Sequence, residues 1–239
     1  MKRKQIDFNI QEAGCLIYVA DRNLGGRPFG DLNSTDWKDL TIENVIMMMS
    51  LYQDDGYSIR VVSGDLTDEE KSEWTSKATW KLNFQSGEMV VSGVCDPDLE
   101  NYIIEFGDGI NDTDCQLGCI VKIPKGAYQV DVYSYPPNDL AGCWKAIEDR
   151  SSFRACFGKD SEIPYEKPTD YFKRTRPNEN PPDWIKESYE DALFLDFVIH
   201  LSLITEEIFT SEFEDDGCLI WKHRKPEICP IGIRLEELD

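Results

Sequence analysis

The chain has 239 residues, of which 25 are Lys or Arg, 46 are Asp or Glu and only two are His, so its formal net charge is −21. This acidic excess disfavours polyanions, including nucleic acids, as partners, and it leaves few side chains that exchange protons near neutral pH. The sequence lacks the run of about 18 apolar residues that a membrane span needs, and no apolar segment follows its basic N-terminus. We therefore expect a cytoplasmic protein that is not embedded in a membrane and whose eight cysteines are free thiols.

Hydrophobic periodicity predicts strands and one short helix in the first third of the chain. The expected strands are a pair within residues 5–20, the apolar stretch 45–51 and a strand at 57–62. Thr67 and Glu70 are spaced as in a capping box, in which each side chain bonds to the backbone N–H of the other residue. This spacing predicts a short helix from residue 67 to about residue 77.

The clearest strand signals lie between residues 78 and 135. Aromatic and aliphatic residues alternate with polar ones, and Ser or Gly turn signals separate the segments. The expected strands are 78–84, 89–91, 102–106, 119–123 and 128–135. Pro124 to Gly126 are expected to form a hairpin turn between the last two strands. In the last strand Val130 would face the core, while Gln129 and Asp131 would face water.

These elements predict a mainly β fold, a sandwich or open barrel with a short helix, plus an α+β C-terminal extension. Residues 1–140 would form the sandwich, and residues 141–239 would pack on it or continue it as one domain. In the second part we expect an extended loop at 158–182, a helix at 183–192, a buried strand at 193–203 and a turn at 215–217.

Acidic residues gather most densely between Asp96 and Asp114, a stretch without any Lys or Arg. Carboxylates bind hard cations such as calcium, but the spacing of glycine and glutamate in this stretch does not match an EF-hand. The stretch is therefore expected to be a solvated or partner-binding loop. Its candidate partner-binding residues are Asp96, Asp98, Glu100, Asp108, Asp112 and Asp114. A second acidic run lies at 206–216.

No motif for catalysis, metal or cofactor binding is strong enough to predict a site. Cys115, Cys119, Cys218, His223 and Cys229 lack the two compact ligand pairs of a structural zinc site, so no metal and no cofactor are predicted. The apolar surroundings of His200 favour a core histidine over a general base. For His223, a low pKa without an evident partner is expected. The basic side chains of segment 221–235 are expected to pair with the protein's own acidic runs or to pin the C-terminus to the main sheet.

Residues 78–138 resemble the competence protein J family, small intracellular inhibitors of a DNA-entry nuclease. The resemblance rests on the segments ATWKLNF, GEMVVSG and IVKIPKGAYQVDVYSYPPN, which contain Pro124, Gly126 and Tyr128. It covers about a quarter of the chain, and residues beyond 140 have no counterpart. The resemblance implies a β-sandwich and admits a nuclease-inhibitor role, but it identifies no binding residues.

Three hypotheses for function follow from these observations. The first is an inhibitor or immunity-type protein whose acidic loops bind a basic nuclease or toxin. The second is a carboxylate- or metal-dependent enzyme, for example a glycosidase, because two catalytic acids need not be close in sequence. The third is a structural or assembly module, which would form a homo-oligomer. The first is preferred, and the sequence favours a binding protein over an enzyme while leaving both alternatives open.

Overall fold

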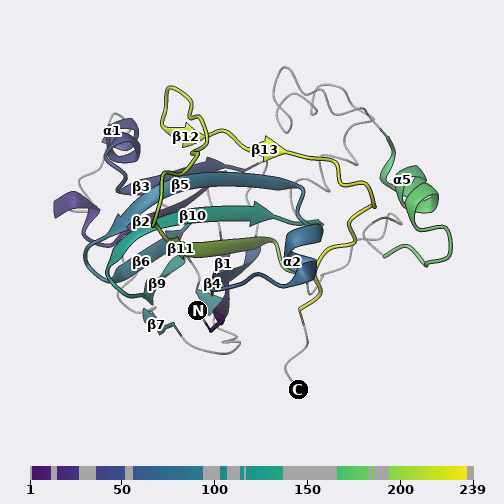
Figure 1. Ribbon diagram of the computed structural model, residues 1–239, viewed down its shortest axis with the longest axis horizontal. Helices are drawn as coiled ribbons and strands as arrows, with labels where there is room; N and C mark the ends of the chain where they lie inside the picture. Colours follow the sequence, from purple (N-terminus) through teal and green to yellow (C-terminus); the bar gives the residue numbers. More distant parts are fainter. Residues whose placement is uncertain are drawn as a thin grey trace.

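The computed structural model shows two β-sheets that pack face to face (Figure 1). It describes residues 2–11, 15–26, 36–51, 56–93, 103–106, 114–115, 117–136, 166–182, 185 and 194–235. Each sheet contains both parallel and antiparallel strand pairs. The prediction of a mainly β fold is confirmed. Within the described residues, no helix has the length and apolar character needed to cross a membrane.

The larger sheet has seven strands in the order β13-β5-β10-β11-β4-β1-β8. Its strands are β1 (Lys4–Gln11), β4 (Gly56–Ser63), β5 (Ser76–Phe84), β8 (Asp114–Cys115), β10 (Gly126–Ser134), β11 (Phe197–Leu203) and β13 (Lys222–His223). β11 lies in the middle of this sheet, antiparallel to β10 and parallel to β4. A strand from the last fifth of the chain therefore lies between β4, from its first third, and β10, from just beyond its middle. The proposed division near residue 140 stays a prediction.

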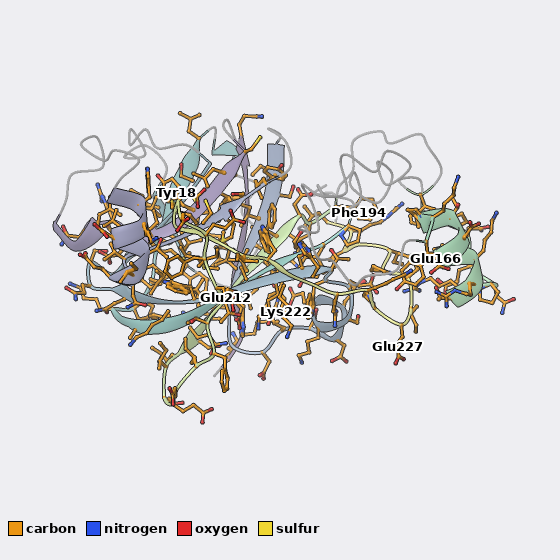
Figure 2. All side chains as sticks on the ribbon, turned by 90° about the horizontal axis from the view of Figure 1, so that it is seen from above. Tyr18, Glu166, Phe194, Glu212, Lys222 and Glu227 are labelled. Carbon is orange, nitrogen blue, oxygen red and sulfur yellow. The ribbon has the colours of Figure 1, made fainter. Side chains whose placement is uncertain are left out.

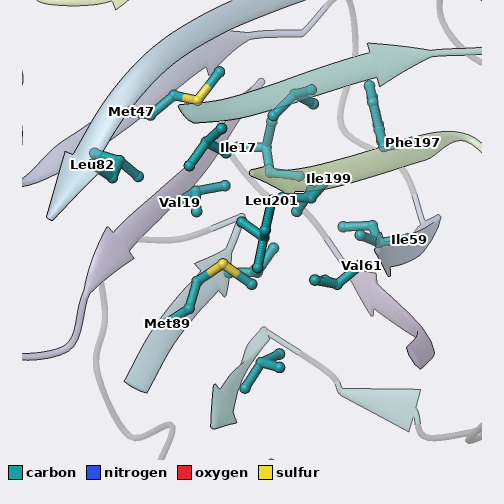
Figure 3. Close-up of a cluster of buried hydrophobic side chains, with 14 of the residues drawn as sticks. Ile17, Val19, Met47, Ile59, Val61, Leu82, Met89, Phe197, Ile199 and Leu201 are labelled. Atoms are coloured by element: carbon teal, nitrogen blue, oxygen red, sulfur yellow. The ribbon is translucent and has the colours of Figure 1, made fainter. Parts of the chain in front are cut away.

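The smaller sheet has six strands in the order β12-β3-β2-β6-β9-β7. Its strands are β2 (Leu16–Asp21), β3 (Ile46–Ser50), β6 (Glu88–Ser92), β7 (Ile103–Glu105), β9 (Gly118–Lys122) and β12 (Cys218–Leu219). Alternate residues of both sheets meet in one apolar core (Figure 3). Ile17 and Met47 enter it from the smaller sheet, and Ile59, Leu82 and Ile199 enter it from the larger one.

Two predicted strand pairings are wrong, although the strands themselves exist. The expected pair within residues 5–20 consists of β1 and β2, which belong to different sheets. Pro124 and Lys125 likewise connect β9 of the smaller sheet to β10 of the larger one, so they do not close a hairpin. The reason is that both faces of the core need strands, and a short connection can cross from one sheet to the other as readily as it can return along the same sheet.

The described helices are α1 (Asp36–Ile42), α2 (Asp68–Ser72), α5 (Pro168–Thr175) and the 3-10 turn η1 (Leu24–Gly26). The capping box is confirmed: Thr67 Oγ1 accepts from Glu70 N, and Glu70 Oε2 accepts from Thr67 N. α2 ends at Ser72, earlier than predicted, because β5 already starts at Ser76.

α5 replaces part of the loop that was expected at 158–182. Pro168 stands in the first turn of the helix, where a missing N–H costs nothing. Tyr171 and Phe172 are buried beneath the helix, and this burial stabilises it despite the many charges of the segment. The helix expected at 183–192 lies outside the described residues except for Ile185.

Candidate functional site

Five of the six predicted partner-binding residues lie outside the described residues. The structure does not describe Asp96, Asp98, Glu100, Asp108 and Asp112. Asp114 is the first residue of β8, whose backbone runs parallel to β1 with Asp114 opposite Asn9. The partner-binding role of this stretch stays a prediction.

The second acidic run is described, and it lies on the surface. It belongs to the β11–β12 loop (residues 204–217), which contains six acidic residues and no basic one. These residues are Glu206, Glu207, Glu212, Glu214, Asp215 and Asp216, and all six are exposed. Among the described residues, a single ion pair reaches them, between Lys38 Nζ and Asp215 Oδ1 at 3.3 Å. Both partners are exposed, so the pair hardly offsets the negative potential of the loop.

Backbone hydrogen bonds anchor the β11–β12 loop at two neighbouring strands. Ile204 N donates to Ala127 O of β10 at 3.1 Å, and Ser211 N donates to Thr79 O of β5 at 2.8 Å. Ser211 Oγ also accepts from Thr79 N at 3.0 Å. Figure 1 shows the chain leaving β11 and crossing the neighbouring strands towards β12. Residues 205–210 therefore form an arch with both ends attached to the sheet.

The second half of the loop is held by packing against the core. Phe213 is partly buried, and its ring meets that of Trp80 edge to face, with centroids 5.7 Å apart. Ile220 N donates to Glu212 O at 2.8 Å, so the segment that carries the exposed Glu212 pairs with the chain that follows β12. The turn expected at 215–217 is confirmed, with Gly217 N donating to Glu214 O.

The loop also carries an apolar residue that sequence reasoning did not single out. The side chain of Phe209 is 97% exposed and stands between Glu207 and Glu212 in the sequence. The residues around it show no alternation of apolar and polar positions, which was the available signal that Phe209 does not belong to a core strand.

A second group of charged side chains lies on the outer face of the larger sheet, where Asp131 does not face water as predicted. This carboxylate is buried; it accepts from Thr79 Oγ1 at 2.7 Å and from Gln129 Nε2 at 2.9 Å, and it lies 3.0 Å from Lys77 Nζ. Burial opposes ionisation, but the neighbouring His200, Thr79 and Lys77 outweigh it and hold the pKa of Asp131 at about 2. At neutral pH Asp131 is therefore a carboxylate that accepts hydrogen bonds and has no proton to donate.

His200 borders this group and is held as a structural residue. Its Nε2 donates to Gly64 O at 2.8 Å, while its Nδ1 lies 4.0 Å from Asp131 Oδ2, too far for a hydrogen bond. His200 is half-buried on the outer face of the sheet, and among the described residues only its Nε2 has a hydrogen-bond partner, so the expectation of a core histidine is wrong.

The basic segment forms a C-terminal strap (residues 221–235), as expected. β13 pairs with the edge of β5, and Arg224 stacks on the Trp74 ring while its Nη2 donates to Ser72 O at the end of α2. Lys225 Nζ binds Glu166 Oε2 at 2.7 Å beside α5. In Figure 2 the strap leads from Lys222 over the sheets to Glu227 near α5. Arg224 and Lys225 therefore bind groups of the protein itself.

His223 has a partner that the sequence did not indicate. Its Nδ1 and Ser76 Oγ form a hydrogen bond of 2.5 Å. Burial lowers the pKa of His223 from 6.5 to about 4, so the low pKa expected from the sequence is confirmed, with burial as its cause. The imidazole is therefore neutral in the folded protein at pH 7.

Acidification should destabilise the protein through His223. Between about pH 6.5 and pH 4 the unfolded chain takes up a proton that the folded protein excludes, so stability falls as pH falls; the lost free energy of unfolding is up to about 3 kcal/mol. His223→Gln keeps an acceptor for Ser76 but does not titrate. Urea unfolding from pH 7 to pH 4 should show a smaller loss for this variant. Equal losses in both proteins would contradict the prediction.

The cysteines weighed as possible zinc ligands do not come together in one site. Cys119 lies in the core of the sandwich, Cys218 starts β12 and Cys229 lies in the strap; all three are buried free thiols. Burial raises the pKa of Cys218 to about 11 and that of Cys229 to about 12, so both are protonated at pH 7. In the part of the chain that the structure describes, no group of three His, Cys, Asp or Glu side chains could hold a metal ion.

Comparisons with known proteins find similarity in structure. No protein-family model matches the chain, and no curated protein matches its sequence. The protein of crocagin biosynthetic gene J is 12% identical, with a TM-score of 0.41 over 85% of this chain and 99% of the other. ComJ from Bacillus subtilis, an inhibitor of the DNA degrading activity of NucA, is 12% identical, with a TM-score of 0.32 over 57% of this chain and 83% of the other. The family suggested by residues 78–138 is thus also among the structural matches.

Proposed function

We propose that this protein is an inhibitor or immunity-type protein that binds a basic protein, such as a nuclease or toxin, in the cytoplasm. The observation that carries the proposal is the β11–β12 loop, whose six exposed carboxylates meet one exposed lysine among the described residues. Such a surface attracts the cationic face on which a nuclease holds the phosphates of its substrate. Occupation of that face would exclude the nucleic acid.

The overall charge and the predicted acidic stretch support the same proposal. A net charge of −21 makes long-range attraction to a basic partner strong at low ionic strength. The stretch that contains Asp96 and Asp114 would add a second acidic surface if it faces the same partner.

Neutralising three carboxylates of the loop should slow association with a basic partner. The variant is Glu206→Gln, Glu207→Gln and Glu212→Gln. Its control removes the same charge from other exposed positions, by Asp65→Asn, Glu69→Gln and Glu227→Gln. Each chain is used to capture proteins from native lysate at low ionic strength, and the retained protein is then purified for kinetics and a nuclease assay.

We expect wild type and control to retain a basic protein and to inhibit its activity, with binding that weakens as salt rises. The loop variant should associate about tenfold more slowly, because electrostatic steering acts mainly on the association rate. NucA provides a defined enzyme for a parallel assay of DNA degradation. A wild-type chain that retains no basic protein at low ionic strength would contradict the proposed function.

A further inference from the structure

Phe209 is the most exposed large apolar side chain of the described residues. Its 97% exposure compares with 56% for Ile228 and 53% for Ile42, the next most exposed. Single exposed aliphatic residues are common on protein surfaces, and many of them keep part of their surface covered. A phenylalanine left almost wholly in water forgoes the stabilisation that burial of its ring would contribute, so its exposed position in the arch calls for a reason.

The arch that carries Phe209 is fixed at both ends. Ile204 is bonded to β10 and Ser211 to β5, so six residues span two points on a rigid sheet. Phe213, two residues after Ser211, is packed on Trp80 of the core. An aromatic side chain on a loop that is attached at both ends loses little conformational freedom when it binds, which favours its use as an anchor.

The charges around Phe209 restrict the class of partner that its side chain can bind. Glu206 and Glu207 precede it, Glu212 follows it, and all three are exposed. Anionic lipid surfaces and nucleic acids would be repelled by these carboxylates. A second copy of this chain would bring the same negative charges together. The partner that suits both the ring and these charges is therefore a protein surface with an apolar pocket bordered by Lys or Arg.

We propose that Phe209 is the anchor of the β11–β12 loop and inserts into an apolar, cation-bordered pocket of a basic partner protein. This inference rests on the proposed function and adds the binding residue and the shape of the complementary site. The two kinds of residue in the loop then have separate effects. The carboxylates steer and orient the encounter, while the buried ring sets how long the complex lasts.

The test compares Phe209→Ala with Ile228→Ala, an exposed apolar residue on the C-terminal strap. The probe is the purified basic protein retained by the wild-type chain in the capture experiment, and surface plasmon resonance measures both rates. Phe209→Ala should speed dissociation at least about tenfold and leave association nearly unchanged, as expected for an interface hot spot. Ile228→Ala should leave both rates near those of wild type, and Phe209→Trp should retain slow dissociation.

A photo-cross-linking residue at position 209 checks the pocket itself. Its adducts should map to apolar partner residues that have Lys or Arg beside them, and the same group at position 228 should give no adduct. If wild type binds and Phe209→Ala dissociates at the wild-type rate, the inference is overturned while the proposed function stands. If wild type retains no basic protein, both are overturned. Circular dichroism of each variant verifies that the fold is unchanged.

Discussion

Replacing Glu70 with alanine is expected to lower the free energy of unfolding by about 3 to 5 kcal/mol, the cost of breaking a buried ion pair. The Glu70 side chain is 1% exposed, and its two oxygens accept from Arg3 at 2.7 and 2.8 Å, from Arg60 at 3.2 Å and from Thr67 N at 2.8 Å. Its removal leaves two guanidinium groups short of an acceptor and leaves Thr67 N without its partner in the capping box of α2.

Glu69→Ala is the matched control, since Glu69 lies beside Glu70 in the same helix turn and is exposed. The control should change the free energy of unfolding by less than about 0.5 kcal/mol. Urea unfolding at pH 7 measures both variants. Glu70→Gln should fall between them, because it retains a capping oxygen but loses the charge. If Glu70→Ala is no less stable than Glu69→Ala, the buried network does not stabilise the fold as described.

Burial opposes the ionisation of Glu70, but Arg3, the Thr67 backbone and Arg60 outweigh it and lower the pKa of Glu70 from its ordinary value near 4.5. A lowered folded-state pKa contributes stability above the unfolded value that is lost as pH falls through the folded one. The difference between wild type and Glu70→Gln should therefore shrink below about pH 4.5.

A chain that ends at residue 140 is expected not to fold. It would lack β11, which pairs with β10 from Tyr128 to Ser134 on one side and with β4 from Ile59 to Ser63 on the other. Phe197, Ile199 and Leu201 would leave the shared core, which would expose the apolar side chains that face them. Circular dichroism and hydrogen exchange should show no cooperative unfolding and little amide protection.

Two substitutions on β11 distinguish the effect of disrupting core contacts from the effect of shortening the chain. Ile199→Asp places a charge at a fully buried core position, whereas Ser202→Asp places it on the outer, half-buried face of the same strand. We expect the first variant to unfold or aggregate and the second to fold. A stable, cooperatively unfolding fragment 1–140 would show instead that the first part is an independent domain.

The features that depend on residues close together in the sequence were predicted correctly. Alternation within Trp80, Leu82 and Phe84 correctly predicted which side chains face the core, because the side chains of a strand alternate between its two faces. The capping box at Thr67 and the turn at Gly217 were also predictable, since each depends on neighbours within a few residues.

The position of the candidate site depended on contacts far apart in the sequence. The acidity of residues 206–216 could be read directly, but the arch exists because Ser211 bonds to Thr79, 132 residues away. The buried state of Asp131 likewise depends on Lys77 and His200, which reach it from the neighbouring strands. Alternation along β10 could assign Asp131 to the outer face but could not show what covers that face.

The β content, the residues that face the core and the negative charge of this protein could all be read from its amino-acid order. The tertiary structure alone decided which strands pair, how β11 enters the centre of the larger sheet and how Phe209 comes to stand in solvent. The physical reason is that a hydrophobic pattern specifies which face of a strand avoids water, while its hydrogen-bond partners are chosen by the burial of both sheets together.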